Sequence, residues 1–194
     1  MKSALAVIAG LIATFSTVPY LIDIIRRKTK PNIVSWFTWT LLLAIATAAA
    51  FAAHEPRTAL LTFGDTVCTL AVVILGLRYG IAKLSRFDFL CQAGAILGLV
   101  LWLIFNSPQI AIIFSLAIDF IVMMPTVRHS WLMPKEETWQ TFAIGVFASA
   151  LTLISLVHYS FSSLAFPVYL GITNALIALT IIYSRKRKGL SLAR

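Results

Sequence analysis

Three polar side chains that could bind a solute or carry a proton lie inside long apolar runs of this 194-residue chain. Asp65 and Asp119 each fall near the middle of such a run, and Asn174 lies within the last one. An ionisable group at the centre of a membrane helix costs roughly 2.5–3.5 kcal/mol, so it usually lines a cavity or meets a partner. We therefore expect functional roles for the two acids, with a hydrogen bond to a neighbouring helix as the structural alternative.

Motifs for catalysis, metal binding or nucleotide binding are missing from the sequence. It contains no HExxH, no CxxC pair, no carboxylate-rich metal cluster and nothing that resembles a P-loop. Cys68 and Cys91 fall inside apolar runs and make neither a disulfide framework nor a zinc site. Every lysine lies at the edge of an apolar run, so none could hold retinal as a Schiff base. We expect no metal, no cofactor and no enzymatic activity.

The composition predicts an all-α membrane protein. Hydrophobic residues make up 60% of the chain and charged residues only 12%, whereas globular proteins average about 45–50% and 25%. A helix needs about 20 mainly apolar residues to cross a bilayer. The sequence predicts seven such helices, over residues 3–25, 33–53, 57–78, 87–105, 108–128, 138–159 and 164–184. Ser85 and Asp88 have the spacing of a capping box, which makes Asp88 structural.

The basic residues predict how the chain is oriented. All sixteen Lys and Arg residues except Lys2 and Arg57 fall on one side of the predicted spans. Because such residues stay in the cytoplasm, we expect the N-terminus outside and the C-terminus inside. The net charge of +9 then reflects membrane topology rather than nucleic-acid binding. The basic loops are expected to contact anionic lipid, and His129, at one of these loops, is expected to be solvated. The location would be the cell membrane, the inner one if the source is bacterial.

Features of the first three predicted helices recur in the last three. Each triplet has a proline near the cytoplasmic end of its first helix, a second proline in the following basic loop and a tryptophan opening the next helix. These residues are Pro19, Pro31 and Trp36 in the first half, and Pro125, Pro134 and Trp139 in the second. The order predicts two parallel three-helix repeats, residues 1–80 and 107–194, joined by a linker helix within residues 81–106.

This arrangement resembles the SWEET and PQ-loop superfamily of seven-helix membrane transporters, and in particular its small bacterial members. The segments around Pro19 and Pro125 resemble the PQ-loop motif, and Lys28-Thr29-Lys30 through Ser35-Trp36 resembles the stretch that follows it. The resemblance covers nearly the whole chain. Tyr20 and Thr126 replace the glutamine of the motif, and the second-helix proline of sugar-transporting members has no counterpart.

The resemblance implies a transporter that moves a small polar, sugar-like solute by alternating access. Asp65 and Asn174 would face each other at a midplane site, as a pair of asparagines does in sugar-transporting relatives. Asp119 or Asp65 would couple transport to protons. The alternatives are a proton-coupled carrier of a cationic or zwitterionic solute or a vitamin, such as the nicotinamide riboside transporters, and a non-transporting receptor or scaffold.

Aromatic residues near the outer ends of two spans are further candidates for solute binding. Phe51, His158 and Tyr159 could stack on a ring of the solute, although aromatic residues there often lie at the membrane interface. Whether the chain assembles into a homo-oligomer stays open.

The repeated prolines and tryptophans are candidates for gating. Pro19 and Pro125 each remove an intrahelical hydrogen bond, so either could be a hinge of an inner gate or a fixed kink. Trp36, Trp39 and Trp139 could belong to an interfacial belt of aromatic residues, or could form part of a gate or pocket wall.

Overall fold

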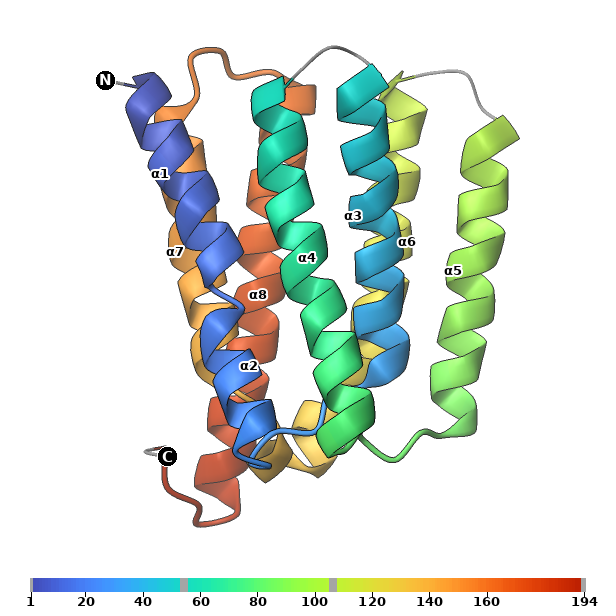
Figure 1. Ribbon diagram of the computed structural model, residues 1–194, viewed down its shortest axis with the longest axis vertical. Coiled ribbons are helices and arrows are strands. Elements are labelled where there is room, and N and C mark those ends of the chain that lie inside the picture. The colour runs from blue at the N-terminus through green and yellow to red at the C-terminus, as the bar shows by residue number, and fades with distance from the viewer. Residues whose placement is uncertain (1, 53–55, 105–107, 193–194) are drawn as a thin grey trace.

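The computed structural model describes residues 2–52, 56–104 and 108–192, without the side chains of residues 49–52, 56–61, 98–99, 101–104, 108–112 and 162 (Figure 1). All regular structure within these residues is helical. The helices are α1 (Lys2–Phe15), α2 (Val18–Ile25), α3 (Ile33–Ala52), α4 (Pro56–Tyr79), α5 (Arg86–Ile104), α6 (Pro108–Leu132), the short 3₁₀ helix η1 (Pro134–Glu136), α7 (Trp139–Ser155) and α8 (Phe161–Arg187). Because α1 and α2 follow one another along a single broken rod (Figure 1), the described residues form the seven helices that the sequence predicts.

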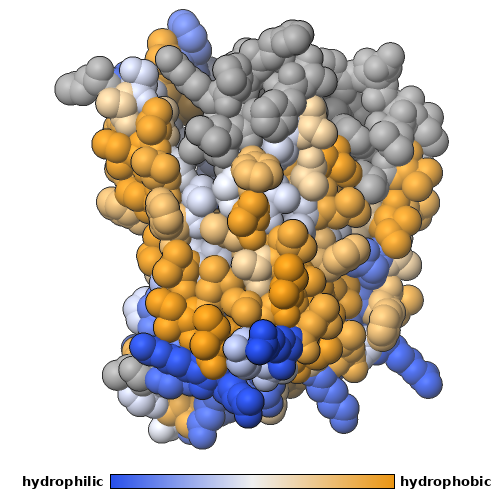
Figure 2. Space-filling view, in the orientation of Figure 1, coloured by the Kyte–Doolittle hydropathy of each residue, from blue (hydrophilic) through white to orange (hydrophobic). Residues whose placement is uncertain are grey.

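The outer surface of this bundle is apolar. Four helices are long and apolar enough to cross a membrane, over Lys2–Ile25, Thr62–Tyr79, Ile113–Leu132 and Ser163–Arg187. Large apolar side chains are exposed along the helices, and Figure 2 shows them over the sides of the molecule with hydrophilic residues gathered at one end. Since such a surface would be unfavourable in water, it is typical of an integral multi-pass membrane protein.

One end of the bundle carries most of the basic residues. We call it the basic end and define it as residues 26–32, 80–85, 128–138 and 185–192, which connect or terminate the helices at the bottom of Figure 1. The main hydrophobic core lies toward this end. Its buried residues are Tyr20, Ile24, Trp36, Val72, Val73, Met123, Phe142, Ile177, Ala178 and Ile181. This half of the bundle is therefore closed by packed side chains.

The two repeated prolines have different effects on their helices. Helix α1 ends at Phe15 and α2 begins at Val18, with Pro19 in the first turn of α2. A proline ring lacks the N–H and clashes with the carbonyl four residues earlier, here that of Phe15, so the helix is interrupted at Ser16 and Thr17. Pro125, by contrast, lies inside the continuous helix α6. The first of the two candidate hinges is thus a helix break, and the second lies within an unbroken helix.

Half of the predicted capping box before α5 is present, because the backbone N–H of Asp88 donates to the carbonyl oxygen of Ser85 rather than to its hydroxyl. The backbone N–H and the hydroxyl of Ser85 both donate to Oδ2 of Asp88, each over 2.5 Å. The other oxygen, Oδ1, accepts a hydrogen bond of 2.8 Å from Nδ2 of Asn32. Asp88 therefore fixes the start of α5 and also attaches it to the loop before α3.

The prediction that His129 is solvated is wrong. Helix α6 continues to Leu132, beyond the predicted end at residue 128, so His129 lies in the helix rather than in a loop. Its side chain is only 7% exposed, and its Nε2 is 3.5 Å from Oε2 of Glu136. The extra turn of helix thus directs this side chain toward η1.

Candidate functional site

A cavity of about 450 Å³ lies between the helices, bordered by α3, α4, α6, α7, α8 and the break between α1 and α2. Much of its wall is apolar or aromatic, and its polar side chains come from α4, α6, α7, α8 and the break between α1 and α2. The polar lining residues are Ser16, Thr17, Thr69, Ser115, Asp119, Thr141, Tyr169, Thr173 and Asn174. A cavity with an apolar wall and a few polar groups is the usual form of a small-molecule site.

Asp119 is the acid in this cavity, and two neighbouring helices hold it in place. Its Oδ1 accepts a hydrogen bond of 2.9 Å from Nε1 of Trp39 on α3, and its Oδ2 accepts one of 2.8 Å from the hydroxyl of Tyr169 on α8. Neither ion pair found in the described part of the chain involves Asp119. An ionised carboxylate has about four acceptor positions. Asp119 can therefore accept further hydrogen bonds from a solute, or pair with a positive charge.

Asn174 lines the same cavity, and a glycine on the neighbouring helix gives it room. Its Nδ2 donates to the carbonyl oxygen of Leu170 over 2.8 Å, one turn earlier in α8. A Cβ atom at Gly145 of α7 would lie 2.7 Å from Oδ1 of Asn174. Glycine at position 145 therefore leaves space for the amide in this position, and a larger residue there would push the amide toward the cavity.

Asp65 lies elsewhere. Its Oδ1 accepts a hydrogen bond of 2.5 Å from the hydroxyl of Thr14, which joins α4 to α1. Asp65 is not among the described residues that line the cavity, whereas Thr69, one turn later in α4, is. The structure therefore brings Asn174 together with Asp119 rather than with Asp65.

Aromatic side chains form the floor of the cavity toward the basic end. The ring of Trp36 lies 4.7 Å from that of Tyr20 and 5.2 Å from that of Trp39, the second pair nearly perpendicular at 88°. Trp36 is only 4% exposed, so it is not part of an interfacial belt. Its counterpart Trp139 is partly buried against the same core, and its Nε1 lies 3.4 Å from the carbonyl oxygen of Leu192. Both gating candidates thus lie between the cavity and the basic end.

Below this floor, helix α2 and the loop that follows it contact the segment before α7. The hydroxyl of Tyr20 donates to Oε2 of Glu137 over 2.9 Å, and that of Thr138 donates to Oδ2 of Asp23 over the same distance. The hydroxyl groups of Thr29 and Thr138 are 2.6 Å apart. We call these contacts the loop–loop contact. All five side chains are buried, so together they seal the basic end.

The remaining predicted solute-binding residues lie away from the described lining of the cavity. His158 and Tyr159 are in the connection between α7 and α8, at the end of the bundle opposite the basic end, and Tyr159 is 66% exposed. The ammonium of Lys2 lies 6.0 Å from the centre of the Tyr159 ring. The side chain of Phe51 falls outside the described residues. A role for these three residues stays a prediction.

Of the two residues that hold Asp119, Trp39 was a candidate for an interfacial belt, a gate or a pocket wall, whereas sequence reasoning missed Tyr169. A signal for each as a neighbour of the cavity was present in the spacing. Trp39 follows Trp36 by three residues, and Tyr169 precedes Thr173 by four, and these spacings place residues on one face of a helix. Because tryptophans near the cytoplasmic ends of helices are also typical of an interfacial belt, the sequence alone does not assign the face shared by Trp36 and Trp39 to the cavity.

The described residues contain no group of three or more His, Cys, Asp or Glu side chains that could hold a metal ion. Cys68 and Cys91 are free thiols. No family model, curated protein or solved structure matches the chain. These comparisons identify no family for it.

Proposed function

We propose that this protein is a transporter that moves a small polar solute across the cell membrane by alternating access. The solute would bind in the central cavity, in contact with Asp119 and Asn174. One observation carries the proposal: a mid-bundle carboxylate, oriented by Trp39 and Tyr169, faces a cavity without an ion-pair partner among the described residues. Because a carboxylate at this depth is costly, a role in solute or proton binding accounts for its presence.

The proposed architecture is two parallel three-helix repeats with α5 as the linker. The packing of the helices supports it. Helix α3 packs on α4 as α7 packs on α8, and α1 packs on α7 as α6 packs on α3. If each helix of one half is replaced by its equivalent in the other half, α3–α4 becomes α7–α8 and α1–α7 becomes α6–α3. This correspondence is expected for repeats related by an axis along the membrane normal. The positive-inside rule places the basic end in the cytoplasm.

Under this proposal, the conformation described is closed toward the cytoplasm. The aromatic floor and the loop–loop contact separate the cavity from the basic end. Transport then requires the first triplet to move relative to the second, which would separate Tyr20 from Glu137 and Asp23 from Thr138. The break before Pro19 is the natural hinge for this motion, and Pro125 is the candidate on the other side.

The cavity favours a positively charged solute with a flat apolar part. Asp119 offers a negative charge, and the rings of Trp39, Phe142 and Tyr169 among the lining residues offer surfaces on which a cation or a ring can pack. A neutral sugar-like solute is the second candidate. The hydroxyl-bearing lining, including Ser115, supports it. Proton coupling through Asp119 or Asp65 fits either solute.

A thermal-shift screen of the purified protein against sugars, amino acids, vitamins and organic cations tests the proposal, because a bound solute stabilises as ln(1 + [L]/Kd). Solutes that stabilise the protein are then offered to proteoliposomes for uptake. For a cationic solute, we expect Asp119→Asn to raise Kd by about tenfold or more, since a hydrogen bond to a charged group contributes about 1.5–3 kcal/mol.

Asp65→Asn is the matched control, because it removes the same charge outside the described lining of the cavity. It is expected to leave Kd within about twofold of the wild-type value. Equal affinities of the wild type and Asp119→Asn would remove Asp119 from the site. Binding without uptake would favour a receptor over a transporter.

A further inference from the structure

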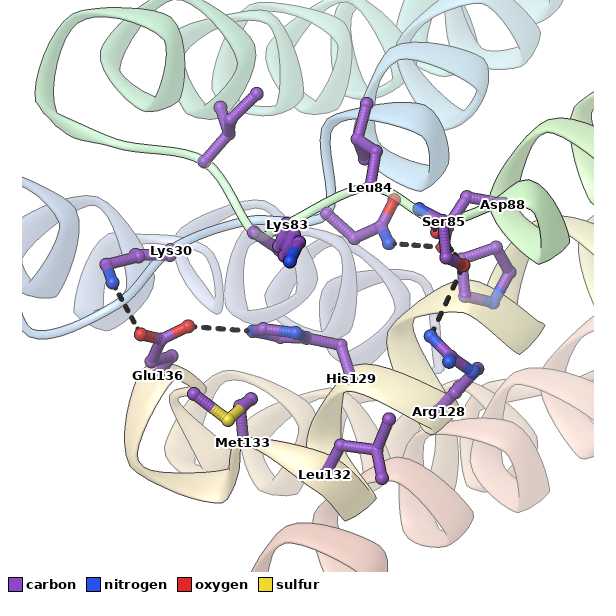
Figure 3. A pocket seen from close by; sticks show the side chains of 14 residues that line it. Lys30, Lys83, Leu84, Ser85, Asp88, Arg128, His129, Leu132, Met133 and Glu136 are labelled. Atoms are coloured by element: carbon purple, nitrogen blue, oxygen red, sulfur yellow. Dashed lines mark hydrogen bonds and ion pairs between the residues drawn. The ribbon is translucent and has the colours of Figure 1, made fainter.

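A second recess, of about 830 Å³, lies at the basic end, away from the central cavity (Figure 3). Three parts of the chain that are distant in sequence form its walls. They are the loop before α3, the connection between α4 and α5, and the last turns of α6 with η1. The residues that matter for its chemistry are Lys30, Lys83, Asp88, Arg128, His129 and Glu136.

Both carboxylates in this recess already have partners within the protein. Asp88 accepts hydrogen bonds from Asn32 and from Ser85. Glu136 pairs with the ammonium of Lys30 through Oε1, and its Oε2 is 3.5 Å from Nε2 of His129 (Figure 3). Glu136 is therefore neutralised by Lys30, whereas Asp88 is held by hydrogen bonds from neutral groups and keeps its charge, which attracts the nearby Arg128.

The other two cations in the recess, Lys83 and Arg128, form no ion pair within the described residues. Lys83 is exposed and forms no hydrogen bond or ion pair within residues 2–52, 56–104 and 108–192. Within the same residues, Arg128 makes one hydrogen bond, a long one of 3.3 Å from Nη1 to the hydroxyl of Ser85, and its guanidinium lies 5.9 Å from the ring centre of Phe87. It forms no ion pair there, although the charge of Asp88 attracts it. With Lys30 included, three cations face two carboxylates, so the recess carries excess positive charge.

Exposed apolar side chains border the same recess. Leu132 and Met133 line it and are 46% and 50% exposed. An anion bound beside Lys83 and Arg128 would therefore have apolar surface next to it. This combination suits an anion that is attached to an apolar group better than a small inorganic ion alone.

We propose that this recess binds a phosphate ester, with Lys83 and Arg128 as its ligands. Guanidinium groups bind phosphate through paired hydrogen bonds, and a lysine adds a compact positive charge. Basic pockets between helices near the membrane surface bind lipid head groups, and Leu132 and Met133 would lie beside the glycerol and acyl portion. A soluble phosphate ester has the same binding chemistry. The proposal does not depend on transport, because it involves none of the residues assigned to the central cavity.

Thermal shifts of the detergent-purified protein test this site with four probes: phosphatidylglycerol, phosphatidylcholine, inorganic phosphate and glycerol 3-phosphate. The double variant Lys83→Gln/Arg128→Gln removes both proposed ligands. We expect its apparent Kd for the stabilising probe to rise by about tenfold or more, since both lost contacts involve a charged group. Lys83→Gln alone breaks no contact within the described residues, so its weaker binding can be measured in a fully folded protein.

The matched control is Arg26→Gln/Arg86→Gln, which removes two charges near the same end from exposed residues that do not line the recess. Stabilisation by phosphatidylglycerol alone, lost only in the Lys83 variants, supports the site and assigns it to a lipid. Stabilisation by glycerol 3-phosphate or inorganic phosphate with the same dependence supports it with a soluble source. Equal losses in the control variant, or no stabilisation by any probe, overturn the proposal.

Discussion

Gly76 marks the closest approach between α4 and the loop before α3, and replacing it with alanine tests the packing of the basic end. A Cβ atom at this position would lie 2.6 Å from Cγ of Pro31 and 3.6 Å from Cδ1 of Ile33. The favourable separation of two carbon atoms is about 3.5–4.0 Å. Pro31 is fully buried, its ring cannot rotate away, and its carbonyl accepts a hydrogen bond of 2.9 Å from the backbone of Ala82. The loop therefore cannot retreat without breaking this bond.

The expected cost follows from two opposing effects. An extra methyl group in a packed region destabilises by about 1–3 kcal/mol, whereas alanine in place of glycine inside a helix contributes about 1 kcal/mol of stability. Because the neighbour at Gly76 is a rigid ring, the upper part of the first range applies. We expect Gly76→Ala to lower the free energy of unfolding by about 1–2 kcal/mol, and Tm by about 3–6 °C.

The assay is thermal unfolding of the purified protein in detergent, with Gly94→Ala as the matched control. Gly94 lies in α5, and the nearest atom to its added Cβ is Cγ2 of Ile121 at 3.5 Å, an ordinary contact. The control is therefore expected to keep or raise Tm through helix propensity alone. If Gly76→Ala melts at the same temperature as Gly94→Ala, Pro31 is free to move and the tight contact of α4 with the loop is refuted.

Two further substitutions test the cavity and its floor by the same melting assay. Tyr20→Phe removes a donor to the buried carboxylate of Glu137 and an acceptor for Nε1 of Trp36. We expect the free energy of unfolding to fall by about 1.5–3 kcal/mol. An unchanged Tm would show that the Tyr20 hydroxyl in the loop–loop contact adds no stability. In Gly145→Ala, the added methyl group pushes against the amide of Asn174, which can turn into the cavity. The loss of stability should therefore stay below about 1 kcal/mol. A loss as large as that of Gly76→Ala would mean that the amide has no space to turn.

The helices could be predicted from the sequence because the bilayer imposes a simple rule. Each span needs about 20 apolar residues, and the predicted starts at residues 33 and 108 coincide with the first residues of α3 and α6. The ends were predicted less well where a helix continues into polar residues. The predicted span that begins at residue 108 ends at Arg128, whereas helix α6 continues to Leu132. A basic residue at a membrane boundary does not stop a helix.

The site was predicted only in part, because helix rotation is not encoded in hydropathy. Asp65 and Asp119 have the same signature in the sequence, an acid near the middle of an apolar run. In the structure, Thr14 of the adjacent helix α1 satisfies Asp65, whereas Asp119 faces the central cavity. Only the packing of α1 on α4 and of α3 on α6 separates the two cases. The pattern of polar and apolar residues cannot distinguish Asp65 from Asp119, because both sides of these helices meet apolar surroundings.

The helix break before Pro19 and the carboxylate of Asp119 border the same cavity, so one function can account for both. Ser16 and Thr17 at the break line the same cavity as Asp119. Interrupted backbone at membrane depth is tolerated only where protein buries it or where it lines a cavity. In transporters, such interrupted helices supply the polar groups that bind the solute. Under the proposed function, the first half of the chain thus contributes a broken helix and the second half contributes the acid and Asn174. The two halves would then make unequal contributions to one site, with the break before Pro19 as the candidate hinge on one side and Pro125 as the candidate on the other.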